Sequence, residues 1–238
     1  MVDIDVLWLT PSRLASDTEP MVLATLDADE RARAQRFATD RARLDFALGR
    51  WLLRRTLEKT TGIASAQWSF AIATHGRPVP VCPSFAVPGR LPDVNLTHGG
   101  GIVAVAASHG ARVGIDAEDL GRDVPSRRLE RFLAGEETRQ IETLGYAERR
   151  VAFWRIWTLK EACLKASGTG IAGGLDSLAV DVSDPNAARI LRWDGAPAAA
   201  VEWRVLEFRP RKTTQLAIAC GVDPGEEVRV HLDEVRVP

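Results

Sequence analysis

A glutamate and a lysine four residues apart, Glu161 and Lys165, form a pair of side chains that could do chemistry together. They lie in the segment 153–171, FWRIWTLKEACLKASGTGI, whose apolar spacing predicts a helix that ends at the glycines from Gly168 onward. Side chains four residues apart share one face of a helix. The pair is therefore either an exposed ion pair, which the spacing alone favours, or a carboxylate and an ammonium group presented to one ligand.

Two further carboxylates, those of Asp116 and Glu118, follow the apolar residues 113–115. We expect a strand here, and residues two apart on a strand point to the same side of a sheet. Two converging carboxylates, with water and phosphate oxygens completing the shell, are ligands that Mg²⁺ prefers. The alternative is a solvated strand end beside Asp119. A third carboxylate would favour the metal site, and Glu161 is the candidate.

His98 stands before three glycines in the segment 95–101, NLTHGGG. A histidine at such a position can close a turn by bonding to the backbone. Alternatively, the glycines let a ligand approach the backbone closely, and Thr97 and His98 donate hydrogen bonds to its phosphate. The residues themselves leave both interpretations open.

Basic residues are concentrated between residues 31 and 59, where few acidic residues oppose them. Their guanidinium groups present a planar fork of donors that binds phosphate well. A solvated helix surface explains the same pattern, and the sequence favours it over a phosphate site. The basic residues are Arg31, Arg33, Arg36, Arg41, Arg43, Arg50, Arg54, Arg55 and Lys59.

The elements that must position these groups form two successive clusters of strands and helices. Strand and helix do not alternate regularly, and this order is typical of an α+β fold. A division near residues 108–112 gives two halves, 1–110 and 111–238. We expect 102–107 and 111–119 to form a β-hairpin. The other expected strands are 2–9, 68–73, 178–182, 201–208, 216–220 and 228–232; the other expected helices are 27–36, 46–57, 126–133 and 136–144, with a loop at 11–20.

The composition excludes several classes of protein. With 238 residues, 45% of them hydrophobic, the chain can bury a core, and its net charge of −1 gives no general attraction to nucleic acid or membrane. Its three distant cysteines form neither a disulfide framework nor a metal-binding motif. The N-terminus lacks signal-peptide features, and no apolar run reaches the ~18 residues of a membrane span. We expect a cytoplasmic protein with no nucleic-acid or membrane partner.

Three short motifs occur in order along the chain: NLTH at 95–98, GIDAE at 114–118 and WTLKEACLK at 157–165. Together they resemble the signature of the 4′-phosphopantetheinyl transferases of the Sfp type. Each motif is weak alone, and their order and separations make the match specific. The resemblance covers most of the chain and is only general after Val182.

The resemblance implies an enzyme that moves the 4′-phosphopantetheine arm of coenzyme A to a serine of acyl or peptidyl carrier domains and releases adenosine 3′,5′-bisphosphate. The carriers would belong to non-ribosomal peptide or polyketide synthesis. The implied fold is a pseudo-dimer of two similar α+β halves in one chain, with the active site in the cleft between them. Residues 1–110 would serve the 3′-phosphate and adenine, and 111–238 would carry the metal. We expect a monomer.

Residue by residue, the resemblance implies that Asp116, Glu118 and Glu161 hold Mg²⁺, or Mn²⁺, since oxygen ligands suit both. Asp116, Glu161 and Lys165 would be catalytic. Our hypothesis is that Glu161, or a water that it positions, takes the proton of the attacking serine. The implied coenzyme contacts are Arg33, Arg43, Arg77, Thr97, His98, Lys160 and Lys165.

One departure from the family pattern concerns the 3′-phosphate. Asp45 stands where an arginine is usual, and Arg41, Arg43 or Arg50 could replace that arginine. Tolerance for dephospho-coenzyme A is therefore a property to test.

The carrier-binding surface implied by the family is the segment 119–133. Its four arginines form either a docking face for acidic carrier domains or a solvated helix surface. They are Arg122, Arg127, Arg128 and Arg131. Two other functions stay open for the whole chain: a Mg²⁺-dependent phosphohydrolase that uses the same carboxylates, and a non-catalytic protein that binds coenzyme A or a carrier. The complete set of carboxylates and Lys165 counts against the last.

Overall fold

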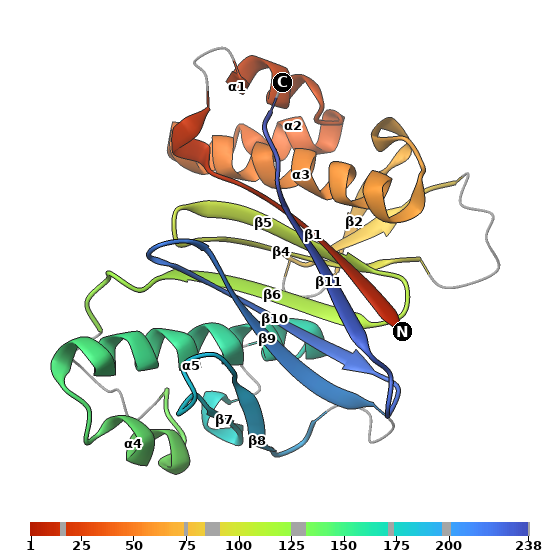
Figure 1. The fold of residues 1–238 in the computed structure, drawn as a ribbon. Coiled ribbons are helices and arrows are strands. Elements are labelled where there is room, and N and C mark those ends of the chain that lie inside the picture. Colours follow the sequence, from red (N-terminus) through yellow and green to blue (C-terminus); the bar gives the residue numbers. More distant parts are fainter. Residues whose placement is uncertain are drawn as a thin grey trace. The chain divides into compact units, whose positions relative to one another are not determined.

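The computed structural model describes residues 1–14, 18–73, 76–83, 91–124, 132–170, 174–196 and 201–237. These divide into two compact units, shown in Figure 1. Unit 1 comprises Met1–Gly110 and Glu227–Pro238, and unit 2 comprises Ala111–Glu226. Both contain helices and strands, so the predicted α+β class is confirmed. The predicted second half, 111–238, is wrong at its end, because the segment from Glu227 onward belongs to unit 1.

The main sheet of unit 1 has the strand order β11-β1-β5-β4. Strand β11 pairs in parallel with β1, as the dark blue and red arrows of Figure 1 show, and this pairing assigns the C-terminal segment to unit 1. The pairs β1–β5 and β4–β5 are antiparallel. The strands are β1 (Val2–Leu9), β4 (Asp93–Gly99), β5 (Ile102–Ser108) and β11 (Val228–Glu234), and a separate pair is β2 (Ser69–Ile72) with β3 (Pro78–Val81).

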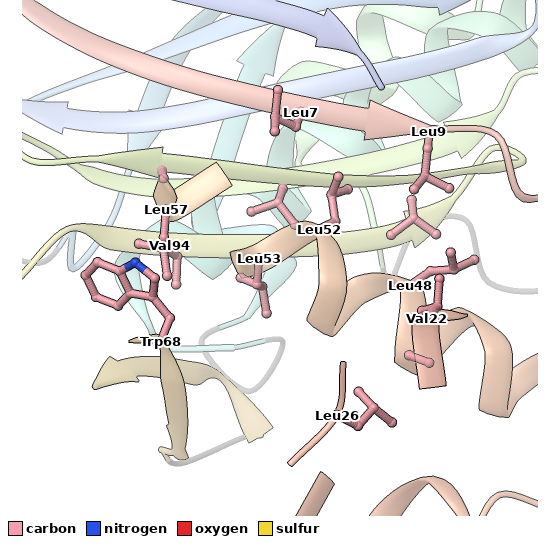
Figure 2. Close-up of a cluster of buried hydrophobic side chains, with 14 of the residues drawn as sticks. Leu7, Leu9, Val22, Leu26, Leu48, Leu52, Leu53, Leu57, Trp68 and Val94 are labelled. Atoms are coloured by element: carbon pink, nitrogen blue, oxygen red, sulfur yellow. The ribbon is translucent and has the colours of Figure 1, made fainter. Parts of the chain in front are cut away.

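Helix α3 supplies much of the core of unit 1. Leu48, Leu52, Leu53 and Leu57 repeat at helical spacing and are fully buried, and Figure 2 shows them with Leu7 and Leu9 of β1. The helix is longer than the predicted 46–57, because the Thr39 side chain caps its first turn and Gly62 ends it in the left-handed conformation. The helices are α1 (Thr18–Ala24), α2 (Ala28–Ala34) and α3 (Asp40–Thr61), with short 3-10 turns at Pro11–Arg13 and Ser65–Gln67. The loop predicted at 11–20 is therefore partly helical.

Unit 2 has a three-stranded antiparallel sheet in the order β6-β10-β9. Its strands are β6 (Arg112–Asp119), β9 (Glu202–Arg211) and β10 (Thr214–Val222), and β7 (Leu178–Asp181) pairs with β8 (Arg189–Trp193). The helices are α4 (Gly135–Ile141) and α5 (Tyr146–Ser167), with a 3-10 turn at Leu175–Ser177. The sequence pattern missed β8, and the helix predicted at 126–133 lies largely outside the described residues.

The two units repeat one order of elements. In each, a first strand is followed by a helix of 22 residues, α3 or α5, then by a 3-10 turn, a two-stranded sheet and two more strands. The strand orders β1-β5-β4 and β6-β10-β9 are equivalent in topology. The sequence shows no strong repeat, so this likeness is one of fold.

The predicted hairpin between 102–107 and 111–119 is wrong. Strand β5 is paired on both edges, with β1 and with β4, so neither edge is available to β6. Strand β6 pairs with β10, about a hundred residues further along the chain. His98 of β4 and Asp116 of β6 therefore belong to different units, and the chain passes from one unit to the other between β5 and β6. Among the described helices, none is both long and apolar enough to cross a membrane.

Candidate metal and phosphate site

Helix α5 packs directly on strand β6, and Gly114 permits the contact. A Cβ atom at Gly114 would collide with the backbone oxygen of Ala162 and the backbone nitrogen of Ala166, and would lie 3.0 Å from Ala166 Cα. Only glycine lets the helix backbone come this close to the strand. The contact sets the position of Glu161 and Lys165 relative to the carboxylates of β6.

Lys165 of α5 reaches Asp116 of β6. Its Nζ donates to Asp116 Oδ1 at 2.6 Å and to the backbone oxygen of Ile115 at 3.1 Å. Asp116 is buried, and the Lys165 side chain is partly exposed. A charge-assisted hydrogen bond of this length between partly buried groups is stronger than an exposed ion pair. The solvated surface pair that the spacing alone favoured is therefore not what the structure shows.

Glu118 and Glu161 complete a cluster of negative charge around Asp116. Burial raises the pKa of Glu118, and the negative charge of Asp116 raises it further, while Arg122 opposes both effects with a hydrogen bond to Glu118 at 2.9 Å. Burial and then Asp116 raise the pKa of Glu161 in the same way. In the described part of the chain, Glu161 Oε1 is buried without a hydrogen-bond partner. The cluster thus holds more negative charge than its neighbours compensate.

The chemistry of this donor set fits a hard divalent cation, although the ligands are not gathered into a closed shell. Among the described residues, no three His, Cys, Asp or Glu side chains form a ready-made metal cluster. Lys165 supplies the positive charge at Asp116 instead. Three carboxylates on one strand and one helix, with a buried Glu161 oxygen lacking a partner, match the oxygen ligands of Mg²⁺.

The prediction that Lys160 contacts coenzyme is contradicted. Its side chain is fully buried, and Nζ donates to Glu137 Oε2 at 2.6 Å and to the backbone oxygen of Phe132 at 3.0 Å. Glu137 also accepts from the backbone nitrogens of Ala134 and Val180. Lys160 therefore joins α5 to α4 and β7 inside unit 2, because a lysine is buried only where a carboxylate pairs with it.

His98 and Thr97 lie on β4 of unit 1. His98 Nε2 is 2.8 Å from the backbone oxygen of Asp45 in α3, and since a carbonyl only accepts, Nε2 carries the proton and donates. Gly49 makes room for the ring, because a Cβ there would lie 2.8 Å from Nε2. His98 thus bonds to the backbone, as the first of the two interpretations of the sequence expected. The bond joins β4 to α3, however, and does not close a turn. Thr97 is buried.

The arginines predicted to bind coenzyme are engaged with groups of unit 1. Arg77 Nη2 donates to both carboxylate oxygens of Asp93, at 2.9 and 2.8 Å. The Arg33 guanidinium lies over the Phe46 ring, 5.4 Å from its centroid. Arg43 bonds to Glu19 and Asp40, both at 3.1 Å, and the hydrogen bond to Glu19 is the largest cause that raises its pKa.

The candidates to replace the missing arginine at position 45 also pair with carboxylates. Arg41 Nε donates to Asp45 Oδ2 at 2.9 Å, so the residue that interrupts the family pattern neutralises a neighbouring arginine. Arg50 is buried between the Phe46 and Phe70 rings, 5.2 and 5.3 Å from their centroids, with Glu30 at 3.6 Å. Burial lowers the pKa of Arg50, and Glu30 opposes this shift. Carboxylates therefore offset part of the positive charge that the sequence shows between residues 31 and 59.

Sequence reasoning missed a second buried polar group in unit 2. Arg155 of α5 pairs with Glu207 of β9 through two hydrogen bonds of 2.9 and 2.6 Å, and Gln215 of β10 donates to Glu207 at 2.6 Å. All three are outside the family motifs. The three residues come from one helix and two strands, and no local sequence pattern says which distant side chains a polar residue meets, so only the fold could reveal this group.

The comparisons with known proteins agree on one family. Residues 112–220 match the family model described as the 4′-phosphopantetheinyl transferase superfamily. The chain is 32% identical over 217 residues to the 4′-phosphopantetheinyl transferase HetI of Nostoc sp., covering 90% of this chain and 86% of that protein. It is 30% identical to a putative 4′-phosphopantetheinyl transferase of Synechocystis sp. (77% and 71% covered) and 26% identical to a 4′-phosphopantetheinyl transferase of Bacillus subtilis (76% and 78% covered).

Proposed function

Since the chain belongs to the 4′-phosphopantetheinyl transferase superfamily, we propose that it loads its carrier proteins with the help of a Mg²⁺ ion held by Asp116, Glu118 and Glu161. The enzyme class follows from the family: the protein transfers 4′-phosphopantetheine from coenzyme A to carrier proteins. This membership disfavours the phosphohydrolase and the non-catalytic binding protein that the sequence left open. The proposal concerns the metal, the residues that act, and the carriers.

The observation that supports this proposal best is the contact between Lys165 and Asp116, with Glu161 one helical turn away. A cation held by these carboxylates would supply positive charge to the pyrophosphate of coenzyme A and to the departing bisphosphate. Lys165 Nζ adds a second positive charge next to Asp116, where negative charge develops on the leaving group. Both effects act in a partly buried setting, where electrostatic interactions are stronger than in water.

We further propose that Glu161 takes the proton of the attacking serine hydroxyl. Among the described residues, its buried Oε1 atom has no hydrogen-bond partner, so that oxygen can accept a proton or a hydrogen bond from an incoming hydroxyl or water. The packing of α5 on Gly114 holds Glu161 and Lys165 in a fixed relation to Asp116. A base held in this way needs no rearrangement when the substrate arrives.

Coenzyme recognition by unit 1 remains a prediction for Arg33, Arg43, Arg77, Thr97 and His98. The pairing of Arg41 with Asp45 supports weak use of the 3′-phosphate, because the acidic side chain both removes one cation and neutralises another. We propose that the enzyme accepts dephospho-coenzyme A nearly as well as coenzyme A. A cleft formed by both halves, and a monomeric enzyme, are further expectations that a structure with bound coenzyme would test.

The carriers are proposed to be acyl or peptidyl carrier domains of non-ribosomal peptide or polyketide synthesis. Of the four arginines predicted for docking, Arg122 is described. It bonds to Glu118 and lies over the Trp154 ring, 4.8 Å from the centroid, so its charge is engaged inside unit 2. Arg127, Arg128 and Arg131 lie outside the described residues. Weaker carrier loading at raised salt would support docking by this segment.

One experiment tests the proposal as a whole. The protein is incubated with coenzyme A, Mg²⁺ and an apo carrier domain, and the carrier is weighed by intact mass spectrometry. We expect addition of the phosphopantetheine group, loss of the addition with a chelator, and recovery with Mg²⁺ or Mn²⁺. Full loading in chelator would overturn the metal proposal. Loading by a Glu161→Gln variant at the parent rate would overturn the role of Glu161 as base.

A further inference from the structure

Gln215 lies on the same face of the sheet as the proposed metal ligands. It is directly opposite Glu118 in the antiparallel pair of β10 with β6, and Ala217 is opposite Asp116. Opposite residues of an antiparallel pair project from the same face, with Cβ atoms about 5 Å apart. Helix α5 covers this face, since its Lys165 bonds to Asp116. Gln215 therefore extends the row of polar groups that begins with Asp116 and Glu118.

The direction of the Gln215 amide is fixed by its neighbours. Its Nε2 donates to Glu207 Oε1 at 2.6 Å. A reversed amide would place its oxygen against that carboxylate oxygen, which is repulsive. Glu207 is held in turn by Arg155, whose guanidinium also donates to the backbone oxygens of Val182 and Asp184, both at 2.9 Å. The Gln215 oxygen must consequently point away from Glu207.

That oxygen has no donor within the part of the chain that the structure describes. Gln215 is fully buried, and its Oε1 atom is a buried acceptor without a hydrogen-bond partner. Such an atom destabilises the folded state unless a donor reaches it. Glu161 Oε1 is in the same condition. Glu161 Oε1 on α5 and Gln215 Oε1 opposite Glu118 are thus two buried oxygens that could each accept a hydrogen bond or bind a cation.

We propose that Gln215 is a positioning residue of the metal site, whose amide oxygen accepts a hydrogen bond from a water on the cation held by Asp116, Glu118 and Glu161. Mg²⁺ keeps several of its waters when bound by carboxylates, and those waters need acceptors. Arg155 and Glu207 orient the amide, so the chain Arg155–Glu207–Gln215 extends the site to β9. The inference rests on the metal site proposed above. It adds Gln215 Oε1 as the acceptor for a water bound to the cation.

The test measures metal binding directly, on the full chain and without turnover. Mn²⁺ is titrated into the parent and into Gln215→Met, which keeps the side-chain length and removes the amide, and free Mn²⁺ is followed by electron paramagnetic resonance with and without coenzyme A. We expect binding about tenfold or more weaker in the variant, as for other residues that orient metal ligands. Equal affinity in a folded Gln215→Met protein would overturn the inference.

Gln140→Met is the matched control. Unlike the Gln215 amide, the Gln140 amide of α4 is satisfied at both ends, by the backbone oxygen of Val180 and the backbone nitrogen of Val182. This variant should lose stability and keep the parent affinity for Mn²⁺. A loss of Mn²⁺ affinity as large as that of Gln215→Met would show a general effect of destabilisation and overturn the inference.

A crystal structure of the parent with Mn²⁺ keeps the inference falsifiable if Gln215→Met does not fold. A water that bonds to both the cation and Gln215 Oε1 is the expected result. A cation whose waters leave Gln215 without contact would overturn the inference and leave the metal site intact. If the parent binds no Mn²⁺ in either condition, the proposed metal site itself fails, so the two failures are distinguishable.

Discussion

Glu161 shows how a site residue can cost stability to the fold that carries it. Burial and the nearby negative charge of Asp116 raise the pKa of its carboxyl, so the ionised form is unfavourable in the metal-free protein. A raised carboxyl pKa removes stability as the pH rises from the ordinary carboxyl range through the folded value. The metal-free protein therefore contains a carboxyl group whose ionised form a bound cation would stabilise. Binding sites commonly trade stability for function in this way.

The variant Glu161→Gln should accordingly be more stable than the parent when metal is removed. We expect a gain of about 1 kcal/mol near pH 8, about 3 °C in Tm, and a gain that vanishes at acidic pH, where the parent carboxyl is protonated. Thermal unfolding in chelator across pH measures this. Carrier loading should be lost in the same variant. A lower Tm than that of the parent at pH 8 would contradict the expectation.

Asp45 provides the corresponding test on the coenzyme side. Its carboxylate accepts a hydrogen bond from Arg41, so position 45 carries a negative charge where the family pattern has a positive one. Asp45→Arg should raise the preference for coenzyme A over dephospho-coenzyme A, in kcat/KM, about tenfold, because a charged hydrogen bond contributes about 1.5 kcal/mol. Asp223→Arg makes the same change of charge at an exposed position of unit 2 and should leave the preference unaltered. Strong discrimination already present in the parent would refute the proposal.

The motifs predicted which of their carboxylates and lysines would lie near one another only in part, and they gave no signal of residues outside them. Motif spacing brought Asp116, Glu118, Glu161 and Lys165 into one hypothesis, and the structure places them in one cluster. Lys160 belongs to the same motif, yet it is buried against Glu137, because a motif does not say which face of the helix each residue occupies. Gln215 gave no signal at all, since its hydrogen-bond partner Glu207 lies on β9 and is held there by Arg155 of α5.

At the scale of elements, local sequence patterns predicted helices and strands whose signals lie within the segment itself. They missed strand pairings, which depend on residues far along the chain. Strand β1 matches its predicted bounds, and Asp27, where a helix was predicted to begin, is the N-cap of α2 and forms a capping box with Glu30. The hairpin failed because β6 pairs with β10, which lies far along the chain. No local feature of 111–119 distinguishes these two partners.

The contact between α5 and β6 at Gly114 should tolerate substitution poorly, because a Cβ atom there meets backbone atoms of the helix. Gly114→Ala would force Ala162 and Ala166 away from the strand, and we expect a loss of about 3 kcal/mol, since backbone atoms cannot move as a side chain can. Urea unfolding measures this, and any folded fraction should load carriers poorly. Gly221→Ala, where the added Cβ meets the Trp203 ring at 3.3 Å, is the milder control on the same sheet. Equal losses in the two variants would contradict this account.

At the scale of the molecule, the family and the α+β class were predicted and are confirmed, while the path of the chain was not. The motifs sufficed for the family because they combine residue type with order. The return of the last segment to unit 1 could not be predicted, because 228–232 reads only as a strand and its partner is β1. Contacts from β11 reinforce the pairing: Asp233 bonds to Lys59 at 2.6 Å and His231 to Asp3 at 2.9 Å.

Removal of Glu227–Pro238 should therefore destabilise unit 1, although the deleted residues follow unit 2 in the chain. Without β11, strand β1 has an unpaired edge that is prone to pair with other chains. Hydrogen exchange should show loss of protection in β1 and α3, with α5 and β10 still protected. Uniform loss of protection in both units, or none, would contradict this. The single substitution Lys59→Met removes one contact of β11, the ion pair with Asp233, and serves as the mild control.

The pairing of β11 with β1 also sets an order for the synthesis of the protein. Within residues 1–238, strand β1 is synthesised before every other element, and its parallel partner β11 is synthesised after them. All residues of unit 2 emerge before unit 1 has its full set of strands, so unit 2 can finish folding while unit 1 cannot. Until β11 emerges, the nascent chain carries an open β1 edge, and chaperones that shield such edges would matter most for unit 1.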